Sequence, residues 1–167
     1  MTTDDELVTQ LLGRAPMGDY RVVVRRDDGS PVVIENAPLL ADGRPMPTRY
    51  WLADRAVNRE IGRLEAEGGV NRAEAEIGLD AIAEIHHRAR VERDAVLGAH
   101  DGPRPSGGVG GTRTGVKCLH AHYAHHLAGI DDAVGRWVEA RLDERGAAFD
   151  PSRPGIASAD DDHEVES

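Results

Sequence analysis

The stretch YRVVVRRDDGSPVVIE at residues 20–35 decides the fold class. Valines follow Tyr20, a second apolar run begins at Pro31, and the strong turn dipeptide Asp28-Gly29 lies between them. This pattern predicts a β-hairpin with strands at residues 20–25 and 31–35. After a proline-rich loop, residues 49–53 (RYWLA) predict a third short strand or an extended docking segment.

Helices are expected before and after these strands in the sequence, because apolar residues recur there at helical spacing. The expected ranges are 3–12, 54–67, 71–97, 116–128 and 131–146, with Asp54, Asn71, Thr114 and Asp131 as N-caps of the last four. The sequence therefore predicts an α+β fold in which a small antiparallel N-terminal sheet packs with about four helices.

Length and composition predict one domain. The chain has 167 residues, and we expect residues 1–146 to form a single globular domain. Residues 147–167 are polar, acidic and proline-containing, so we expect a disordered tail that folding does not need. The acidic start MTTDDELVTQ lacks the apolar core of a signal peptide, and no apolar run is long enough to span a membrane. With a single cysteine, these features favour a cytoplasmic protein without membrane insertion.

The charge is unevenly distributed. The formal net charge is -10, which argues against nucleic-acid binding, because neutralising phosphates requires clustered Lys and Arg. Between Gly102 and Ile130, however, there is no Asp or Glu, while three cations (Arg104, Arg113 and Lys117) and four histidines are present. We expect this stretch to form a positive island that could attract a small anionic ligand.

The most unusual segment is GGTRTGVKCLHAHYAHHLAG at residues 110–129. At 100° per residue, Cys118, His122 and His125 fall on one narrow stripe of the expected helix. Thiolate and imidazole are ligands for Zn²⁺, and imidazole also suits Fe, so these three residues could hold a metal. The alternatives are a solvated histidine face with a buried Cys118, or histidines that act in catalysis or ligand binding without a metal.

The glycine-rich loop before that helix could bind an anion. Its glycines leave backbone N–H groups free, and the helix N-terminus adds positive potential beside Arg113 and Lys117. Gly111 and Gly115 would supply the backbone conformations, and the alternative is a flexible connector.

Two residues of the long helix expected at residues 71–97 complete the set of candidates. His86 lies at the edge of the apolar stripe, where it could meet the histidine helix across a cleft, or could be an ordinary semi-buried histidine. Arg93 is a further ligand-binding candidate. Of Tyr50 and Trp51, which alternate along an extended segment, one ring would pack in the core and the other could wall a pocket.

The block VKCLHAHYAHHLAG, preceded by the glycine-rich loop, resembles the signature of a bacterial family common in actinobacteria, domain of unknown function 501. The stretches LGRAPMG, PLLADGRPMPTRYWL and RLEAEGG, and His86 with Arg93-Asp94, match as well. The resemblance implies no established activity and therefore no substrate. Many relatives carry cysteines where this chain has Arg25-Arg26 and Ala53-Asp54, so a zinc site built on those cysteines cannot form here.

These observations lead to one leading hypothesis and two alternatives. The leading hypothesis is a ligand or active site around Cys118, His122 and His86, acting on a phosphorylated or carboxylated small molecule. The Cys118 thiol would have a lowered pKa near a helix N-terminus and Lys117. The alternatives are a non-enzymatic protein that interacts with cell-envelope or division machinery, and a metal-binding regulatory module. The sequence identifies no protein partner.

Overall fold

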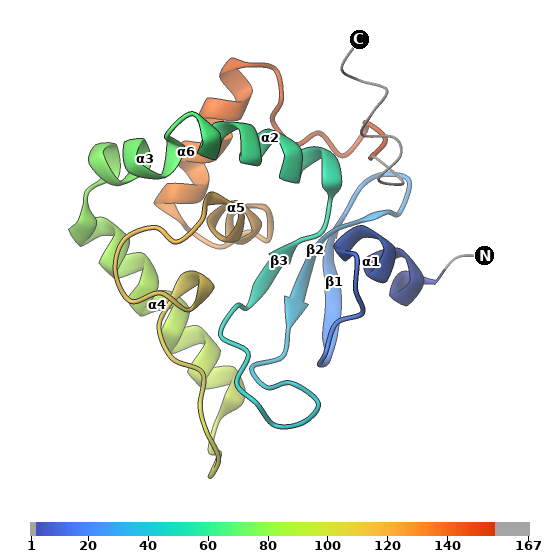
Figure 1. Ribbon diagram of the computed structural model, residues 1–167, viewed down its shortest axis with the longest axis vertical. Helices are drawn as coiled ribbons and strands as arrows, with labels where there is room; N and C mark the ends of the chain where they lie inside the picture. The colour runs from blue at the N-terminus through green and yellow to red at the C-terminus, as the bar shows by residue number, and fades with distance from the viewer. Residues whose placement is uncertain (1–2, 156–167) are drawn as a thin grey trace.

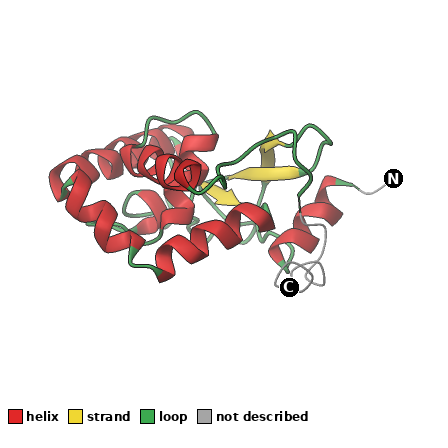
Figure 2. Ribbon diagram, turned by 90° about the horizontal axis from the view of Figure 1, so that it is seen from above, coloured by secondary structure: helices red, strands yellow, loops and turns green. Residues whose placement is uncertain are grey.

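The computed structural model describes residues 3–155 of the chain (Figure 1). Within this range, six α-helices, three strands and one short 3-10 helix follow one another along the sequence. In order they are α1 (Asp4–Leu12), β1 (Tyr20–Arg25), β2 (Pro31–Asn36), β3 (Tyr50–Leu52), α2 (Arg55–Ala66), α3 (Gly69–Ile77), α4 (Leu79–Leu97), η1 (Val109–Gly111), α5 (Leu119–Leu127) and α6 (Ala133–Glu144). The fold is α+β, as predicted. The sheet and α1 lie on one side, and the other helices gather on the opposite side (Figures 1 and 2).

The sheet is antiparallel, with the strand order β1-β2-β3. Ile34 of the central strand lies opposite Val22 on one side and Trp51 on the other. Gly29, with a φ of 90°, forms the tight turn between β1 and β2, which confirms the predicted hairpin. Nearly all residues of the central strand β2 are buried, so both of its faces are covered.

The helices differ from the expectation at one break. The single long helix expected at residues 71–97 is wrong: it is divided into α3 and α4 at Gly78, whose φ of 92° and ψ of 143° are incompatible with a continuing helix. Helix α1 lies where a short helix was expected, so only this division adds a helix to the five expected ranges. Helix α3 begins at Gly69, and the expected cap Asn71 lies inside it. The predicted cap Asp54 is confirmed, because its side chain accepts the N–H of Val57 at 3.0 Å.

The start of α5 also differs from the expectation. The helix begins at Leu119 rather than at residue 116, and Cys118 precedes it in an extended conformation with φ -153° and ψ 151°. Thr114 is therefore not its cap. The next helix is capped by Asp132 rather than by Asp131, because the Asp132 side chain accepts the N–H of Gly135 at 3.0 Å.

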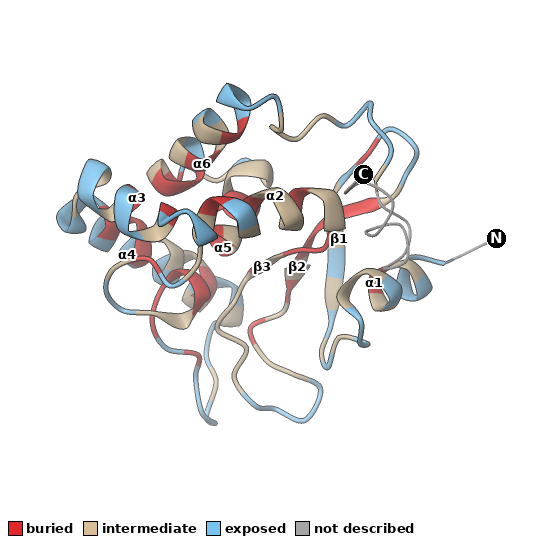
Figure 3. Ribbon diagram, turned by 45° about the horizontal axis from the view of Figure 1, so that its top comes forward, coloured by how far each residue is buried: buried red, intermediate tan, exposed pale blue. Residues whose placement is uncertain are grey.

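The core surrounds α5. This helix contacts β3, α2, α6 and η1, and six of its nine residues are buried. Figure 3 shows this buried helix between α2, α6 and the sheet. Leu119, Tyr123 and Ala124 have no exposed surface, so the helix that carries the histidines is also the central packing element.

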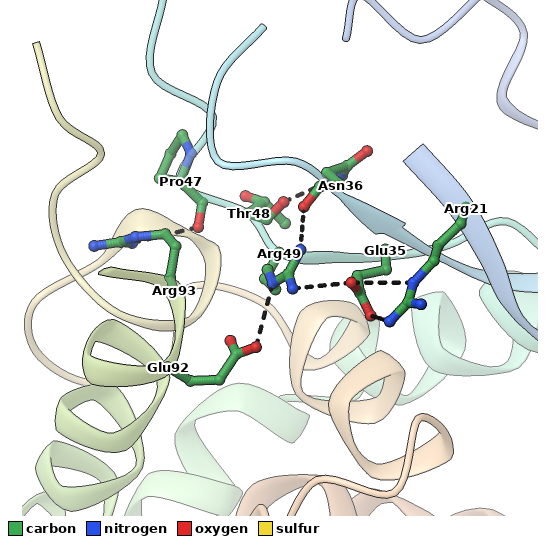
Figure 4. A network of polar contacts seen from close by, with 8 residues as sticks. All are labelled: Arg21, Glu35, Asn36, Pro47, Thr48, Arg49, Glu92 and Arg93. Atoms are coloured by element: carbon green, nitrogen blue, oxygen red, sulfur yellow. Dashed lines mark hydrogen bonds and ion pairs between the residues drawn. The ribbon is translucent and has the colours of Figure 1, made fainter. Parts of the chain in front are cut away.

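A polar network connects the sheet to α4 (Figure 4). The Arg49 guanidinium is 2.9 Å from Oε1 of Glu35 and 3.4 Å from Oε1 of Glu92, and it donates to the backbone oxygen of Asn36 at 2.6 Å. Arg49 is thus held on three sides immediately before β3. This network fixes the position of β3 relative to α4.

The segment that follows α6 packs against the domain. Within residues 147–155, the Phe149 N–H donates to the hydroxyl of Tyr123 at 3.2 Å, and the Arg26 guanidinium donates to the backbone oxygen of Asp150 at 2.9 Å. The guanidinium carbon of Arg26 is 5.2 Å from the centroid of the Phe149 ring. The packed structure therefore extends beyond the expected boundary at residue 146, and the rest of the expected tail lies outside the described residues.

Candidate functional site

The structure separates the three residues that were expected to share one stripe. His122 and His125 are buried on α5 around Asp132, whereas Cys118 precedes the helix and lines a pocket beside His120. The prediction that they share one helical face is wrong, because Cys118 lies before the first residue of the helix and its backbone is extended. Among residues 3–155, no group of three or more His, Cys, Asp or Glu side chains is arranged to hold a metal ion.

Asp132 organises the two buried histidines. Its Oδ2 lies 2.8 Å from Nδ1 of His122 and 3.5 Å from Nδ1 of His125. Burial alone would raise the pKa of Asp132, but the hydrogen bond from His122 and the interaction with the nearby His125 ring outweigh this effect and hold the pKa well below its ordinary value. The carboxylate therefore accepts the Nδ1 proton of His122. The Nε2 atom of His122 is buried without a hydrogen-bond partner in the described part of the chain.

His86 is a buried histidine with both ring nitrogens in use. Its Nδ1 accepts the N–H of Val109 at 3.0 Å, and its Nε2 lies 2.6 Å from the backbone oxygen of Gly115. A carbonyl oxygen can only accept, so the ring is neutral and carries its proton on Nε2. Burial lowers the pKa of His86, although the hydrogen bond to Gly115 partly opposes this. His86 thus holds the glycine-rich loop and has no ring nitrogen left for catalysis.

Arg93 holds the same loop from its other end. Its guanidinium is buried and donates to the backbone oxygens of Gly107 at 3.0 Å and of Pro105 at 3.1 Å. These contacts with the main chain show a structural function for Arg93, where the sequence had suggested ligand binding.

The glycine-rich loop is folded tightly on itself. The N–H of Gly108 donates to the oxygen of Thr112 at 2.7 Å, the N–H of Gly111 to the oxygen of Gly108 at 3.0 Å, and the N–H of Val109 to His86. A Cβ atom on Gly108 would lie 2.5 Å from Cα of His86, so this position has room only for glycine. The backbone N–H groups that were expected to receive an anion are largely used within the loop.

Three further candidate residues lie in the same loop, namely Gly111, Arg113 and Gly115. Gly111 and Gly115 adopt positive φ values of 78° and 64°. A Cβ on Gly111 would lie 3.2 Å from the Pro47 ring, and one on Gly115 would lie 3.3 Å from Oε2 of Glu74. These glycines serve the close packing of the loop, and the side chain of Arg113 is exposed.

The reactive side chains meet instead in a pocket of about 220 Å³ between β3 and the start of α5. Lys117, Cys118 and His120 line one side, and Tyr50 and Trp51 line the other. The Nζ atom of Lys117 donates to the backbone oxygen of Gly110 at 3.1 Å, which connects the glycine-rich loop to the pocket wall.

His120 and Glu65 are the residues that sequence reasoning missed. Oε1 of Glu65 lies 3.1 Å from Nδ1 of His120 and accepts the N–H of Leu119 at 2.7 Å. Nε2 of His120 lies 3.3 Å from the backbone oxygen of Asn58. Both ring nitrogens face acceptors, so the doubly protonated ring satisfies both contacts. His120 could have been selected from its place two residues after Cys118, whereas nothing local in the sequence marks Glu65.

The pKa values of Cys118 and His120 move in opposite directions. Burial raises the pKa of Cys118, but interactions with the His120 side chain and with the Ala121 backbone outweigh it and lower the pKa of the thiol from its ordinary value. Burial lowers the pKa of His120, but the interactions with Cys118 and Glu65 outweigh it and raise the pKa above 6.5. These shifts favour a thiolate beside an imidazolium, which is the reactive form of a cysteine.

Another hollow in the described structure is larger but has different chemistry. A cavity of about 450 Å³ between α1 and the hairpin turn is lined by Asp4, Asp28 and Asp54 and contains no cysteine or histidine. Each of these carboxylates already has a partner, respectively Arg25, Ser30 and Arg26. The pocket beside Cys118 is therefore the better candidate for a reactive site.

The chain was also compared with known proteins. No curated protein and no solved structure is detectably similar to it. Among the described helices, none has the length and apolar character required to cross a membrane. A family model described as protein of unknown function (DUF501) matches residues 22–140, which is more than half of the chain. The match begins within β1, ends within α6 and includes all lining residues of the pocket beside Cys118 except Leu12, and the chain belongs to the DUF501 family.

Proposed function

We propose that the chain is an enzyme that uses the Cys118 thiolate as a nucleophile on a small carboxylated or phosphorylated molecule. The observation that carries this proposal is the position of Cys118 and His120 in the wall of one pocket, with Glu65 3.1 Å from Nδ1 of His120. A thiolate is a strong nucleophile, and an adjacent imidazolium both stabilises it and holds a proton for a leaving group.

Each residue of the set has a defined chemical task. Cys118 would supply the electron pair that attacks an electrophilic carbon or phosphorus atom of the substrate. His120 would pass a proton to the departing group, while Glu65 keeps the imidazole oriented and favours its charged form. His86, Arg93 and the glycine-rich loop would act as the scaffold that fixes Lys117 at the pocket.

The electrostatic setting supports an anionic substrate. The acid-free stretch from Gly102 to Ile130 supplies Lys117 and His120 to the pocket wall, in a chain whose net charge is -10. The local positive potential attracts small anions, whereas the net negative charge of the whole chain disfavours nucleic acid as a partner. The single cysteine fits a reducing compartment, so we place the protein in the cytoplasm.

The two alternative functions have weaker support. A Zn²⁺ or Fe²⁺ site on Cys118, His122 and His125 lacks convergent ligands among residues 3–155. An interaction with cell-envelope or division machinery has no comparable group of contacts in the described structure. The thiolate proposal is therefore the one to test first.

The pH dependence of Cys118 alkylation tests the proposal. In the full chain, the rate at which iodoacetamide reacts with Cys118 should have its pH midpoint below that of an ordinary thiol, and His120→Gln should move that midpoint upward. His126→Gln is the matched control, because His126 stacks on Tyr123 and does not line the pocket. A wild-type profile with an ordinary thiol midpoint, unchanged in His120→Gln, would contradict the proposal.

A mass measurement tests the covalent step. The chain is incubated with a small thioester and with a small phosphate ester, and the intact mass is followed. An adduct that forms on the wild type and is absent from Cys118→Ser is expected. Absence of any adduct on the wild type across a panel of such esters would count against nucleophilic catalysis.

A further inference from the structure

We infer that the pocket beside Cys118 takes a small monocarboxylate with a flat apolar body. This inference rests on the proposed function, because it names the class of molecule for the same pocket. It follows from four features of the pocket: its size, its apolar wall, its charge and the hydrogen bonds of the adjoining loop.

The size restricts the ligand to a small molecule. The pocket volume is about 220 Å³. Pockets that enclose drug-sized ligands span about 300–1,000 Å³, so a nucleotide or a longer chain would not be enclosed here. A single ring with one substituent is the size that fits.

The apolar wall favours a flat body. Leu12, Trp51 and Leu52 line the pocket, and the indole of Trp51 is a broad planar surface. Aromatic groups pack on such a surface in offset or edge-to-face arrangements that add to the gain from burial. The side chains of Leu12 and Leu52 can neither donate nor accept a hydrogen bond, so the part of the ligand beside them must be apolar.

The charge of the pocket favours one negative group. Of the described residues that line it, none is acidic. Lys117 uses one of its three N–H donors on Gly110 and has others to offer. The guanidinium carbon of Arg14 is 5.8 Å from the ring centroid of Trp51 and adds a second positive charge beside the wall. A carboxylate on the ligand would pair with Lys117.

The adjoining loop disfavours phosphate. Loops that cradle phosphate do so with several free backbone N–H groups. Here the N–H groups of Gly108, Val109 and Gly111 are already bonded within the loop or to His86. A phosphate dianion would therefore find the Lys117 ammonium but no cradle of amides, and a carboxylate needs fewer donors.

Binding of benzoate to the wild-type chain tests the inference. In a chemical-shift titration, benzoate should move the amide signals of Lys117, His120 and Ala121. Acetate lacks the flat body, benzyl alcohol lacks the charge, and inorganic phosphate lacks both the body and the single charge. We expect each of the three to bind at least tenfold more weakly than benzoate. Equal or stronger shifts of the same amides with phosphate or acetate would overturn the inference.

Three variants identify the groups that recognise the ligand. Lys117→Gln and Trp51→Leu should each weaken benzoate binding at least tenfold. Arg113→Gln should leave it unchanged, because Arg113 is exposed on the same loop but does not line the pocket. Equal affinity in the wild type and Lys117→Gln would overturn the inference, and the comparison among ligands on the wild type holds even if a variant fails to fold.

This test separates the inference from the proposed function. The shifts report binding and need no thiolate, so an unreactive Cys118 with selective benzoate binding would reject only the enzyme proposal. A reactive Cys118 whose alkylation is slowed by phosphate as strongly as by benzoate would reject only the monocarboxylate.

Discussion

The Nδ1 atom of His122 lies 2.8 Å from Oδ2 of Asp132, and both side chains are almost completely inaccessible to solvent. The other oxygen of Asp132 accepts the N–H of Gly135 in the first turn of α6. One carboxylate therefore connects the centre of α5 to the start of the next helix. Because no water can replace these contacts, the pair stabilises the core rather than the pocket.

Removing this carboxylate should destabilise the fold. Asp132→Ala deletes a helix cap and leaves the Nδ1–H of His122 without an acceptor, which should lower the free energy of unfolding by about 3 kcal/mol. Asp131→Ala is the control, because Asp131 is exposed and pairs only with exposed arginines, so a change of at most about 1 kcal/mol is expected. Urea unfolding at neutral pH measures both, and equal losses in the two variants would contradict the structural function of Asp132.

The same carboxylate should give a pH dependence at the acidic end. The folded pKa of Asp132 lies below its ordinary value of 3.8, so its contribution to stability is fully present above pH 3.8. That contribution is lost as the pH falls through the folded pKa. We therefore expect the stability difference between wild type and Asp132→Ala to shrink as the pH falls below 3.8. If the stability difference between the two proteins grew on acidification, the expected direction of the pH dependence would be wrong.

His86 should control the glycine-rich loop. His86→Ala leaves the N–H of Val109 without its acceptor, and we expect faster hydrogen exchange at that amide and a loss of about 2–4 kcal/mol in unfolding free energy. His87→Ala is the matched control on the exposed face of α4.

The contribution of His86 to stability should also depend on pH, and it should decrease on acidification. The folded pKa is lowered from 6.5, so the neutral ring contributes stability above pH 6.5 that is lost as the pH falls through the folded value. The difference between wild type and His86→Ala should accordingly shrink below pH 6.5. If hydrogen exchange at the Val109 amide were equal in wild type and His86→Ala, the hydrogen bond between Val109 and His86 would be contradicted.

The segment after α6 should contribute to stability. A chain truncated after Gly146 loses the hydrogen bond from Phe149 to Tyr123 and the packing of the Phe149 ring against Arg26. We expect a clear drop in its unfolding midpoint relative to a chain truncated after residue 155. Equal midpoints would support the original expectation that folding does not need any residue beyond 146.

The sequence predicts the elements that depend on neighbouring residues. The hairpin follows from valine-rich strands and Asp28-Gly29, and the start of α2 follows from Asp54. The predicted start of α5 was wrong, because the true start depends on a distant residue. Glu65 lies 54 residues before Leu119 and accepts the N–H of Leu119. The break at Gly78 was missed because a single glycine within an amphipathic pattern is often tolerated in a helix.

The candidate site shows the same limit. Composition and spacing pointed to residues 110–129, and Lys117 and Cys118 of this segment line a pocket. The helical stripe paired Cys118 with His122, whereas the extended backbone at Cys118 places its thiol beside His120. His86 was selected for chemistry, but its two hydrogen bonds to the loop backbone could be found only from tertiary structure.

Two glycines in the chain should respond in opposite directions to the same substitution. At Gly108 a new Cβ would lie 2.5 Å from Cα of His86 on α4. The His86 backbone is held within α4 and the loop is held by its own hydrogen bonds, so neither can move away freely. Gly108→Ala should therefore cost about 1–3 kcal/mol and accelerate hydrogen exchange at Val109. Gly62 lies within α2 with nothing within 4 Å of its Cβ position. Gly62→Ala should therefore stabilise the fold by about 0.5–1 kcal/mol through a better helix propensity. Urea unfolding of the two variants checks both signs, and a stabilised Gly108→Ala would show that the loop does not pack against His86 as described.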